Sequence, residues 1–118
     1  MANIYKNVQK VLNAAGSDVD MYESPTATAS IIKTVKLFNT HSGALDVTVK
    51  VFDATTSTDF EYKVASINAN EGVDLLTFNN IIVLEAGDKL KMQCATADKI
   101  KMTASLLQIL RTQPTDQI

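Results

Sequence analysis

The chain has 118 residues (12.8 kDa), of which 46% are hydrophobic and 20% charged. This composition excludes a disordered chain and allows one hydrophobic core without disulfides. The formal net charge of -2, the absence of any Lys/Arg block and the shortness of the apolar runs argue against a nucleic-acid partner, a membrane-surface tail and a membrane span of roughly 20 residues.

The first ten residues, MANIYKNVQK, lack the apolar core of a secretory signal, so we expect the protein to be made and kept in a cytoplasm. We predict a strand over 3–12. An amphipathic helix over 4–15 is the alternative, because Ile4, Val8, Val11 and Leu12 approximate a helical stripe. A second helical alternative covers 104–110. We favour strands at both ends because the rest of the chain has the period of a sheet.

Polar or glycine-bearing breakers recur about every ten residues. They separate nine predicted strands, at 3–12, 18–23, 29–38, 44–52, 59–66, 72–77, 80–84, 88–94 and 99–110. The sequence therefore predicts an all-β fold, an antiparallel β-sandwich of about 8–9 short strands that is immunoglobulin-like or jelly-roll-like. We expect one domain over 1–110 and a C-terminal tail over 111–118.

Period-2 alternation predicts which side chains face the core. In the strand over 44–52, the valines Val47, Val49 and Val51 share one face. In the strand over 59–66 the same rule places Phe60, Tyr62 and Val64 on the apolar face. The strands over 88–94 and 99–110 alternate in the same way.

The hairpin over 81–94 has two different arms. The run 81–84 is apolar throughout, so it needs cover on both faces, from the opposite sheet and from another subunit or a terminal segment. The arm over 88–94 alternates and needs cover on one face only. We therefore expect a charge at Val83 to destabilise the fold or its assembly, and Lys91→Glu to leave the fold intact.

Three predicted strands carry lysine pairs, and the pairs would form a basic stripe if the strands were sheet neighbours. The pairs are Lys33 and Lys36, Lys89 and Lys91, and Lys99 and Lys101. We favour a protective role against edge-to-edge aggregation, because no aromatic residues are interleaved for base stacking.

Residues for chemistry are few. His41 lies in a predicted turn, where a lone histidine is usually solvated, and Cys94 lies in an alternating strand, where it packs as a small hydrophobe. A Ca²⁺ site at Asp18, Asp20 and Glu23 is possible, but the spacing does not match a calcium loop, and paired acids on a strand usually form its wet face. We expect no catalytic, cofactor or metal site and no enzyme.

Three stretches carry a resemblance: YESP at 22–25, IIKTVKLFNT at 31–40 and LEAGDKL at 84–90. Together they resemble the plan of small all-β virion structural proteins of tailed bacteriophages, over roughly 5–109. The resemblance implies a sandwich fold and a place in the head, neck, tail or fibres, and it brings no catalytic residues.

From this pattern we expect a non-enzymatic virion structural protein, an assembly or decoration subunit that docks on capsid, neck or tail components and is a homo-oligomer. We expect it in the virion, assembled in the host cytoplasm, without nucleic-acid or membrane partners. The alternative is an adhesion or glycan-binding module that recognises a host surface. The interface residues we predict are Ile82, Val83, His41, Ser42, Thr56, Ser57, Asn70 and Glu71.

Overall fold

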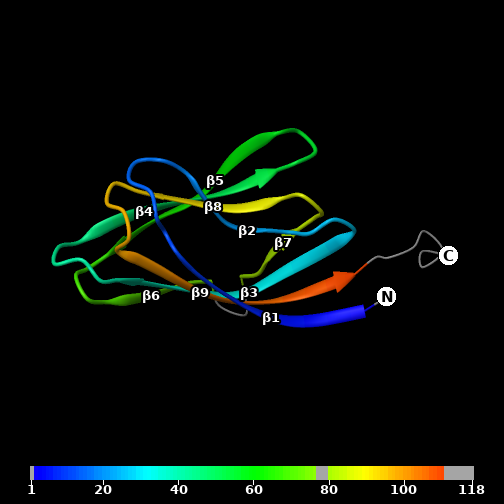
Figure 1. Ribbon diagram of the computed structural model, residues 1–118, viewed down its shortest axis with the longest axis horizontal. Coiled ribbons are helices and arrows are strands. Elements are labelled where there is room, and N and C mark those ends of the chain that lie inside the picture. The colour runs from blue at the N-terminus through cyan, green and yellow to red at the C-terminus, as the bar shows by residue number, and fades with distance from the viewer. Residues whose placement is uncertain (1, 77–79, 111–118) are drawn as a thin grey trace.

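The computed structural model describes residues 2–76 and 80–110 and contains two antiparallel sheets packed face to face (Figure 1). Sheet A contains β1 (Ala2–Val11), β9 (Ile100–Leu110), β3 (Thr28–Asn39) and β6 (Gly72–Leu76) in this order, and β7 (Ile82–Leu84) also pairs with β3. Sheet B contains β2 (Val19–Glu23), β8 (Lys89–Cys94), β4 (Leu45–Asp53) and β5 (Thr58–Ile67). The predicted all-β sandwich is confirmed.

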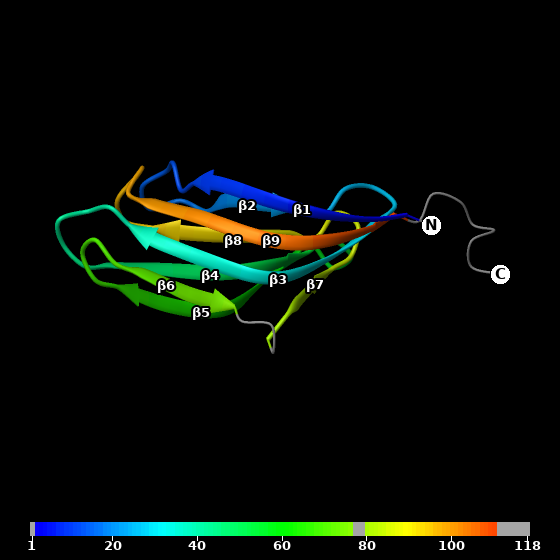
Figure 2. The same cartoon turned by 90° about the horizontal axis from the view of Figure 1, so that it is seen from below.

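The chain alternates between the two sheets along most of its length. Only β4 and β5, in sheet B, and β6 and β7, in sheet A, follow one another within one sheet. With β7 set aside, two four-stranded sheets built in this way form a jelly roll, which is one of the two sandwich types that the sequence left open. Figure 2 shows sheet A in front, with β1 along one edge and β6 and β7 along the other.

The core lies between the sheets and follows the alternation of the strands. Leu90, Met92 and Cys94 of β8 and Val47 and Val49 of β4 are buried, as the period-2 pattern predicted. Both termini of the described chain are strands, since β1 and β9 pair over their whole length. The helical alternatives at 4–15 and 104–110 are therefore wrong. Among the described residues, no helix is long and apolar enough to cross a membrane.

One predicted core face is wrong. Phe60, Tyr62 and Val64 are all exposed, and Ala65 and Ile67 are the buried side chains of β5. A register shift against β4, where Val49 lies opposite Lys63 but Lys50 lies opposite Glu61, accounts for Val64, which lies opposite the outward-facing Thr48. Phe60 keeps the core-face phase opposite Val51 and is exposed on the edge strand β5. A bulge of this kind adds one residue to a strand and changes the face to which the following side chains point.

The strand boundaries differ from the prediction most at β7. The predicted strand 80–84 is paired only over Ile82–Leu84, and Ile81 is exposed outside it. The last residue of the predicted strand 72–77 and the predicted tail 111–118 lie outside the described residues.

A buried polar network connects the two sheets near β7. The Tyr22 hydroxyl lies 2.7 Å from Ser30 Oγ and accepts a hydrogen bond from Gln108 Nε2 at 2.8 Å. Ser24 Oγ lies 2.9 Å from Ser30 Oγ and donates to the Thr28 carbonyl. The tyrosine and the serine of the YESP stretch thus satisfy polar groups that would otherwise be costly to bury.

Two side chains hold turns together at opposite ends of the sandwich. Asn39, fully buried, donates from Nδ2 to the carbonyls of Gly43 and Ile67, each at 3.0 Å. Asp88 accepts hydrogen bonds from the Ala54 and Glu85 amides at 2.9 and 3.0 Å. The groups that bond to the Asn39 and Asp88 side chains are main-chain carbonyls and amides in or next to turns, so these bonds hold the turns in place.

Candidate docking surface

Four apolar side chains stand directly opposite one another on the outer face of sheet A. The register places Tyr5 opposite Leu107, Leu107 opposite Ile31, and Ile31 opposite Val83. The row crosses β1, β9, β3 and β7, and residues in register on antiparallel strands point to the same face. We call Tyr5, Leu107, Ile31 and Val83 the apolar ladder.

The apolar ladder faces away from the core. Tyr5 is 77% exposed and Val83 is 53% exposed, while Leu107 and Ile31 between them are half-buried. On the inner face, Ile82 and Leu84 flank Val83 in the chain and are buried. Strand β7 therefore has apolar side chains on both faces, and only the inner ones are covered within the described chain.

The other half of the same face is mainly polar. The row nearest the far end places Val11 opposite Lys101 and Lys101 opposite Phe38. The neighbouring row contains Gln9, Thr103, Lys36 and Asp74, and Lys36 Nζ lies 3.7 Å from Asp74 Oδ1. Val11 and Phe38 are exposed apolar side chains, but Lys101 separates them, so the continuous apolar row lies at the β7 end.

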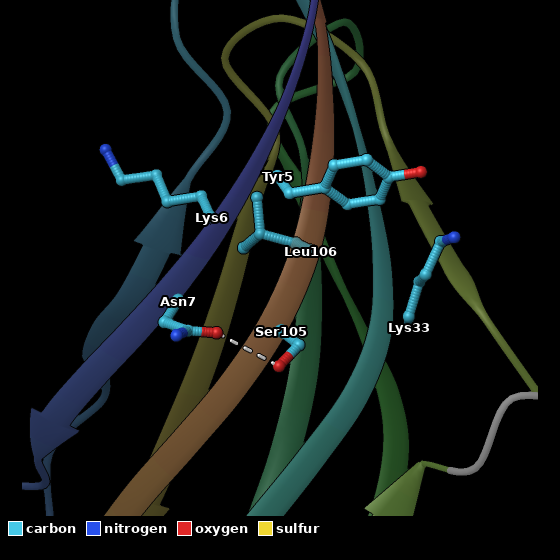
Figure 3. Close-up of a pocket in the computed structure, with 6 residues that line it drawn as sticks. All are labelled: Tyr5, Lys6, Asn7, Lys33, Ser105 and Leu106. Atoms are coloured by element: carbon cyan, nitrogen blue, oxygen red, sulfur yellow. Dashed lines mark hydrogen bonds between the residues drawn. The ribbon is translucent and has the colours of Figure 1, made fainter.

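A shallow hollow of about 260 Å³ lies beside the ladder (Figure 3). Its lining residues are Tyr5, Lys6, Asn7, Lys33, Ser105 and Leu106. The Tyr5 ring extends across β9 toward β3, where Lys33 Nζ lies 5.5 Å from the ring centroid. Ser105 Oγ donates to Asn7 Oδ1 at 3.2 Å. The hollow combines one exposed aromatic ring with amide, hydroxyl and ammonium groups.

The outer face of sheet B is built differently, because its central strands carry lysines and its edge strands carry acids. Lys50 lies 3.2 Å from Asp18, Lys89 lies 3.2 Å from Asp20, and Lys91 lies 3.1 Å from Asp59. Lys89 and Lys91 also stand over the Phe52 ring, at 5.5 and 4.6 Å from its centroid. The lysines of this face are therefore paired with acids of the same molecule.

The sheet order divides the predicted lysine stripe, and the ion pairs involve the acids of the calcium alternative. Lys89 and Lys91 belong to sheet B, whereas Lys33, Lys36 and Lys101 lie on adjacent strands of sheet A. The acids considered for Ca²⁺ are paired with lysines, Asp18 with Lys50, and both Asp20 and Glu23 with Lys89. No group of three potential metal ligands occurs in residues 2–76 and 80–110.

The two residues considered for nucleophilic chemistry have structural roles. Cys94 is a free thiol buried in the core. His41 Nδ1 accepts a hydrogen bond from the Gly43 amide at 3.0 Å, and the His41 amide donates to Asn39 Oδ1 at 2.8 Å. The histidine ring therefore stabilises the turn that Asn39 anchors.

The predicted interface residues fall into three places. Val83 belongs to the apolar ladder, and Ile82, only 7% exposed, points into the core. His41 and Ser42 share an end of the sandwich with Asn70 and Glu71, because Asn39 bonds both turns. The exposed Thr56 and Ser57 lie in the β4–β5 turn at the other end. Their part in an interface stays a prediction.

Sequence reasoning missed Tyr5, Ile31 and Leu107. Each lies in a strand that was predicted, but the row appears only when four strands distant in sequence are put in register. The available signal was local: Leu107 and Ile31 are each the neighbour of a core residue of the same apolar type, Leu106 and Ile32.

No known protein-family model matches the chain, and no curated protein is similar to it in sequence. Among solved structures, the fold is similar to that of a protein of Bacillus endospore appendages, described as disulfide-linked pili. The TM-score is 0.51 with 12% identity, and the alignment covers 93% of this chain and 89% of that one.

Two structures of a pentameric capsid protein isolated from metagenomic phage sequences are also similar, at TM-scores of 0.39 and 0.38 and 16% identity. The alignments cover 92% of this chain but only 64% and 62% of the capsid chains. The similarity to the appendage protein extends over nearly the whole of both chains and concerns the sandwich fold.

Proposed function

We propose that this protein is a non-enzymatic structural subunit of a bacteriophage particle, an assembly or decoration protein that docks on capsid, neck or tail components through the outer face of sheet A. The single observation that carries the proposal is the apolar ladder. Large exposed apolar rows are uncommon on monomeric proteins and mark surfaces that bind other proteins.

The energetic basis is the area that the ladder leaves in water. Full burial of a large apolar side chain is worth about 1.5–3 kcal/mol. Tyr5 and Val83, the two ends of the ladder, are the most exposed members and gain most from a covering surface. A partner that covers the ladder therefore gains several favourable contacts from one flat, rigid face.

The fold supports a structural role. The appendage protein with the same fold is a pilus protein, and the sequence resembles small virion proteins along YESP, IIKTVKLFNT and LEAGDKL. Since Cys94 is the only cysteine and is buried, contacts between subunits of this protein would be non-covalent. Its place would be the virion, after assembly in the host cytoplasm.

The docking role is tested by sedimentation velocity of the full chain, alone and with purified particle proteins. Val83→Glu places a charge in the ladder and should weaken association by about tenfold or more. Val11→Glu places the same charge at the far end of the same face, away from the ladder, and should weaken association less. Equal behaviour of the two variants would contradict the proposal.

The virion assignment has its own test. The genes beside this one should encode capsid, portal, neck or tail proteins, and the protein should be found in purified particles by mass spectrometry. Its absence from purified particles would refute the assignment, even if the ladder binds another protein.

The hollow beside Tyr5 favours a second function, binding of a host glycan. An exposed aromatic ring with amide and hydroxyl neighbours is the kind of surface on which a sugar ring stacks. The isolated chain should then bind host cells or a glycan array, and Asn7→Ala should reduce this binding while leaving docking unchanged. Val83→Glu should reduce docking and leave glycan binding unchanged.

A further inference from the structure

The net charges of the strands of the two sheets are of opposite sign. The strands of sheet A contain five lysines and one aspartate, whereas the strands of sheet B contain four lysines and six acids. The chain as a whole has a formal charge of only -2. The molecule is therefore polarised across its thickness, with a basic sheet and an acidic sheet.

The polarity is stronger at the surface than the counts suggest. In sheet B three of the four lysines are largely covered, with the Lys91, Lys50 and Lys89 side chains 17%, 18% and 27% exposed, and only Lys63 is open. The acids lie on the edge strands β2 and β5 and are more open, with the Glu23 side chain 56% exposed and Glu61 also exposed. The surface that a partner would meet is acidic.

In sheet A the basic groups are open. Lys33 and Lys101 are exposed on the outer face and form no ion pair within the described part of the chain. Lys33 lies against Tyr5 of the apolar ladder, and Lys101 lies at the far end of the same face. A surface that covers sheet A thus needs apolar groups and negative charge together.

Sheet B presents both. On its outer face the edge strand β5 carries the exposed apolar Val64, opposite Thr48, and the exposed Glu61, opposite Lys50. The outer faces extend along the 54 Å and 22 Å axes of the molecule. A face of these dimensions is larger than the roughly 800 Å² that each partner buries in a standard interface.

From this complementarity, and resting on the proposed docking role of sheet A, we propose that the outer face of sheet A binds the outer face of sheet B of a second copy of this chain. Such an interface joins two different surfaces, so the pair keeps one free sheet A face and one free sheet B face. Association of this type continues into a stack or closes into a ring.

The test uses two double charge reversals in the full chain, with sedimentation velocity as the readout. Lys33→Glu with Lys101→Glu makes the sheet A face acidic, and Glu23→Lys with Glu61→Lys makes the sheet B face basic. Each variant alone should associate about tenfold more weakly than the unmodified chain, because like charges then meet. A mixture of the two should regain association, since each variant offers the face that the other needs.

The control is Lys63→Glu with Lys99→Glu, which changes the net charge by the same amount as the sheet A variant. Lys63 lies opposite the buried Val49 at the edge of the inner face, and Lys99 precedes β9. This control should associate like the unmodified chain, and circular dichroism should show that all variants are folded.

Three results would overturn the inference. One is normal association of the Glu23→Lys, Glu61→Lys variant, which would indicate that sheet A binds sheet A. Another is failure of the mixture to recover. The third is an unmodified chain that stays monomeric up to about 100 µM. In that case, loss of particle incorporation in Val83→Glu would still support docking on another protein, and its retention would refute the proposed function as well.

Discussion

The two outer faces of this sandwich belong to the same fold and have the same strand geometry, yet they differ in how their side chains are satisfied. Sheet B carries Lys50, Lys89 and Lys91 in ion pairs with acids of neighbouring strands and with Asp18. Sheet A carries an apolar ladder that ends in Tyr5 and Val83, both largely in water. The difference shows that a sheet can satisfy the side chains of its outer face within one molecule, or leave apolar side chains exposed for a second molecule to cover.

The physical reason lies in what each kind of side chain needs. An ion pair on a strand face finds its partner on the next strand and needs nothing further. An apolar row on an outer face gains only when a further surface removes it from water. The lysines of sheet B are therefore satisfied within the subunit, whereas sheet A presents the apolar ladder that gains from assembly.

The largest expected effect separates the two sides of β7. Ile82→Asp places a charge in the core and should lower the free energy of unfolding by about 4 kcal/mol or more, because a buried unpaired charge is strongly destabilising. Val83→Asp, one residue on, should lower it by about 1 kcal/mol or less and act on association. Urea denaturation of both variants measures this, and similar losses would show that the outer side of β7 is also covered.

The next effect distinguishes the two sheets directly. Lys91→Glu sets a third acid beside Asp59 and Asp20 and removes the ammonium from the Phe52 ring, so it should cost about 2 kcal/mol. The sequence led us to expect that this change leaves the fold intact, and we now expect a folded but less stable variant. Lys33→Glu on sheet A should cost less than about 0.5 kcal/mol. Thermal unfolding that orders the two variants in reverse would argue against a self-sufficient sheet B.

A smaller effect concerns the interior beneath the ladder. Gln108 lies opposite Ser30 in the inner row next to the ladder, and both bond the Tyr22 hydroxyl. Tyr22→Phe should lower the free energy of unfolding by about 1–2 kcal/mol, because it leaves two buried groups with one partner fewer. A neutral result in equilibrium denaturation would mean that this network does not support the ladder end.

The smallest effect comes from salt. Raising the ionic strength screens the pairs of sheet B, so the unfolding free energy should fall by less than about 1 kcal/mol. Lys33→Glu should keep this dependence, since Lys33 forms no ion pair within the described residues. Lys91→Met should reduce it, and denaturation curves at low and high salt that do not differ between these variants would contradict the assignment.

Local patterns were sufficient for the architecture. Val47, Val49, Leu90 and Met92 alternate with polar residues, and the structure buries each of them. The pattern misled at β5, since a bulge between Phe60 and Val64 means that the two no longer share one face as they would in a regular strand. A bulge inserts one residue without leaving a glycine or proline that would signal it in this strand.

The docking surface could be predicted only in part. The run 81–84 is apolar at every position, so it predicted apolar side chains on both faces of its strand and pointed to Val83. Tyr5 lies 78 positions before Val83 in the chain, and their alignment depends on the register of β1, β9, β3 and β7. Register is set by the whole sheet, so a single sequence does not reveal such a row.

The most direct test is hydroxyl-radical footprinting of the assembled protein against the dissociated subunit, read at Tyr5. Tyr5 is 77% exposed in the subunit and stands at the end of the apolar ladder. Its oxidation should fall severalfold on assembly, while that of Phe38, on the polar half of the same face, should fall less. Equal oxidation of Tyr5 in both states would show that sheet A is not the face through which this protein assembles.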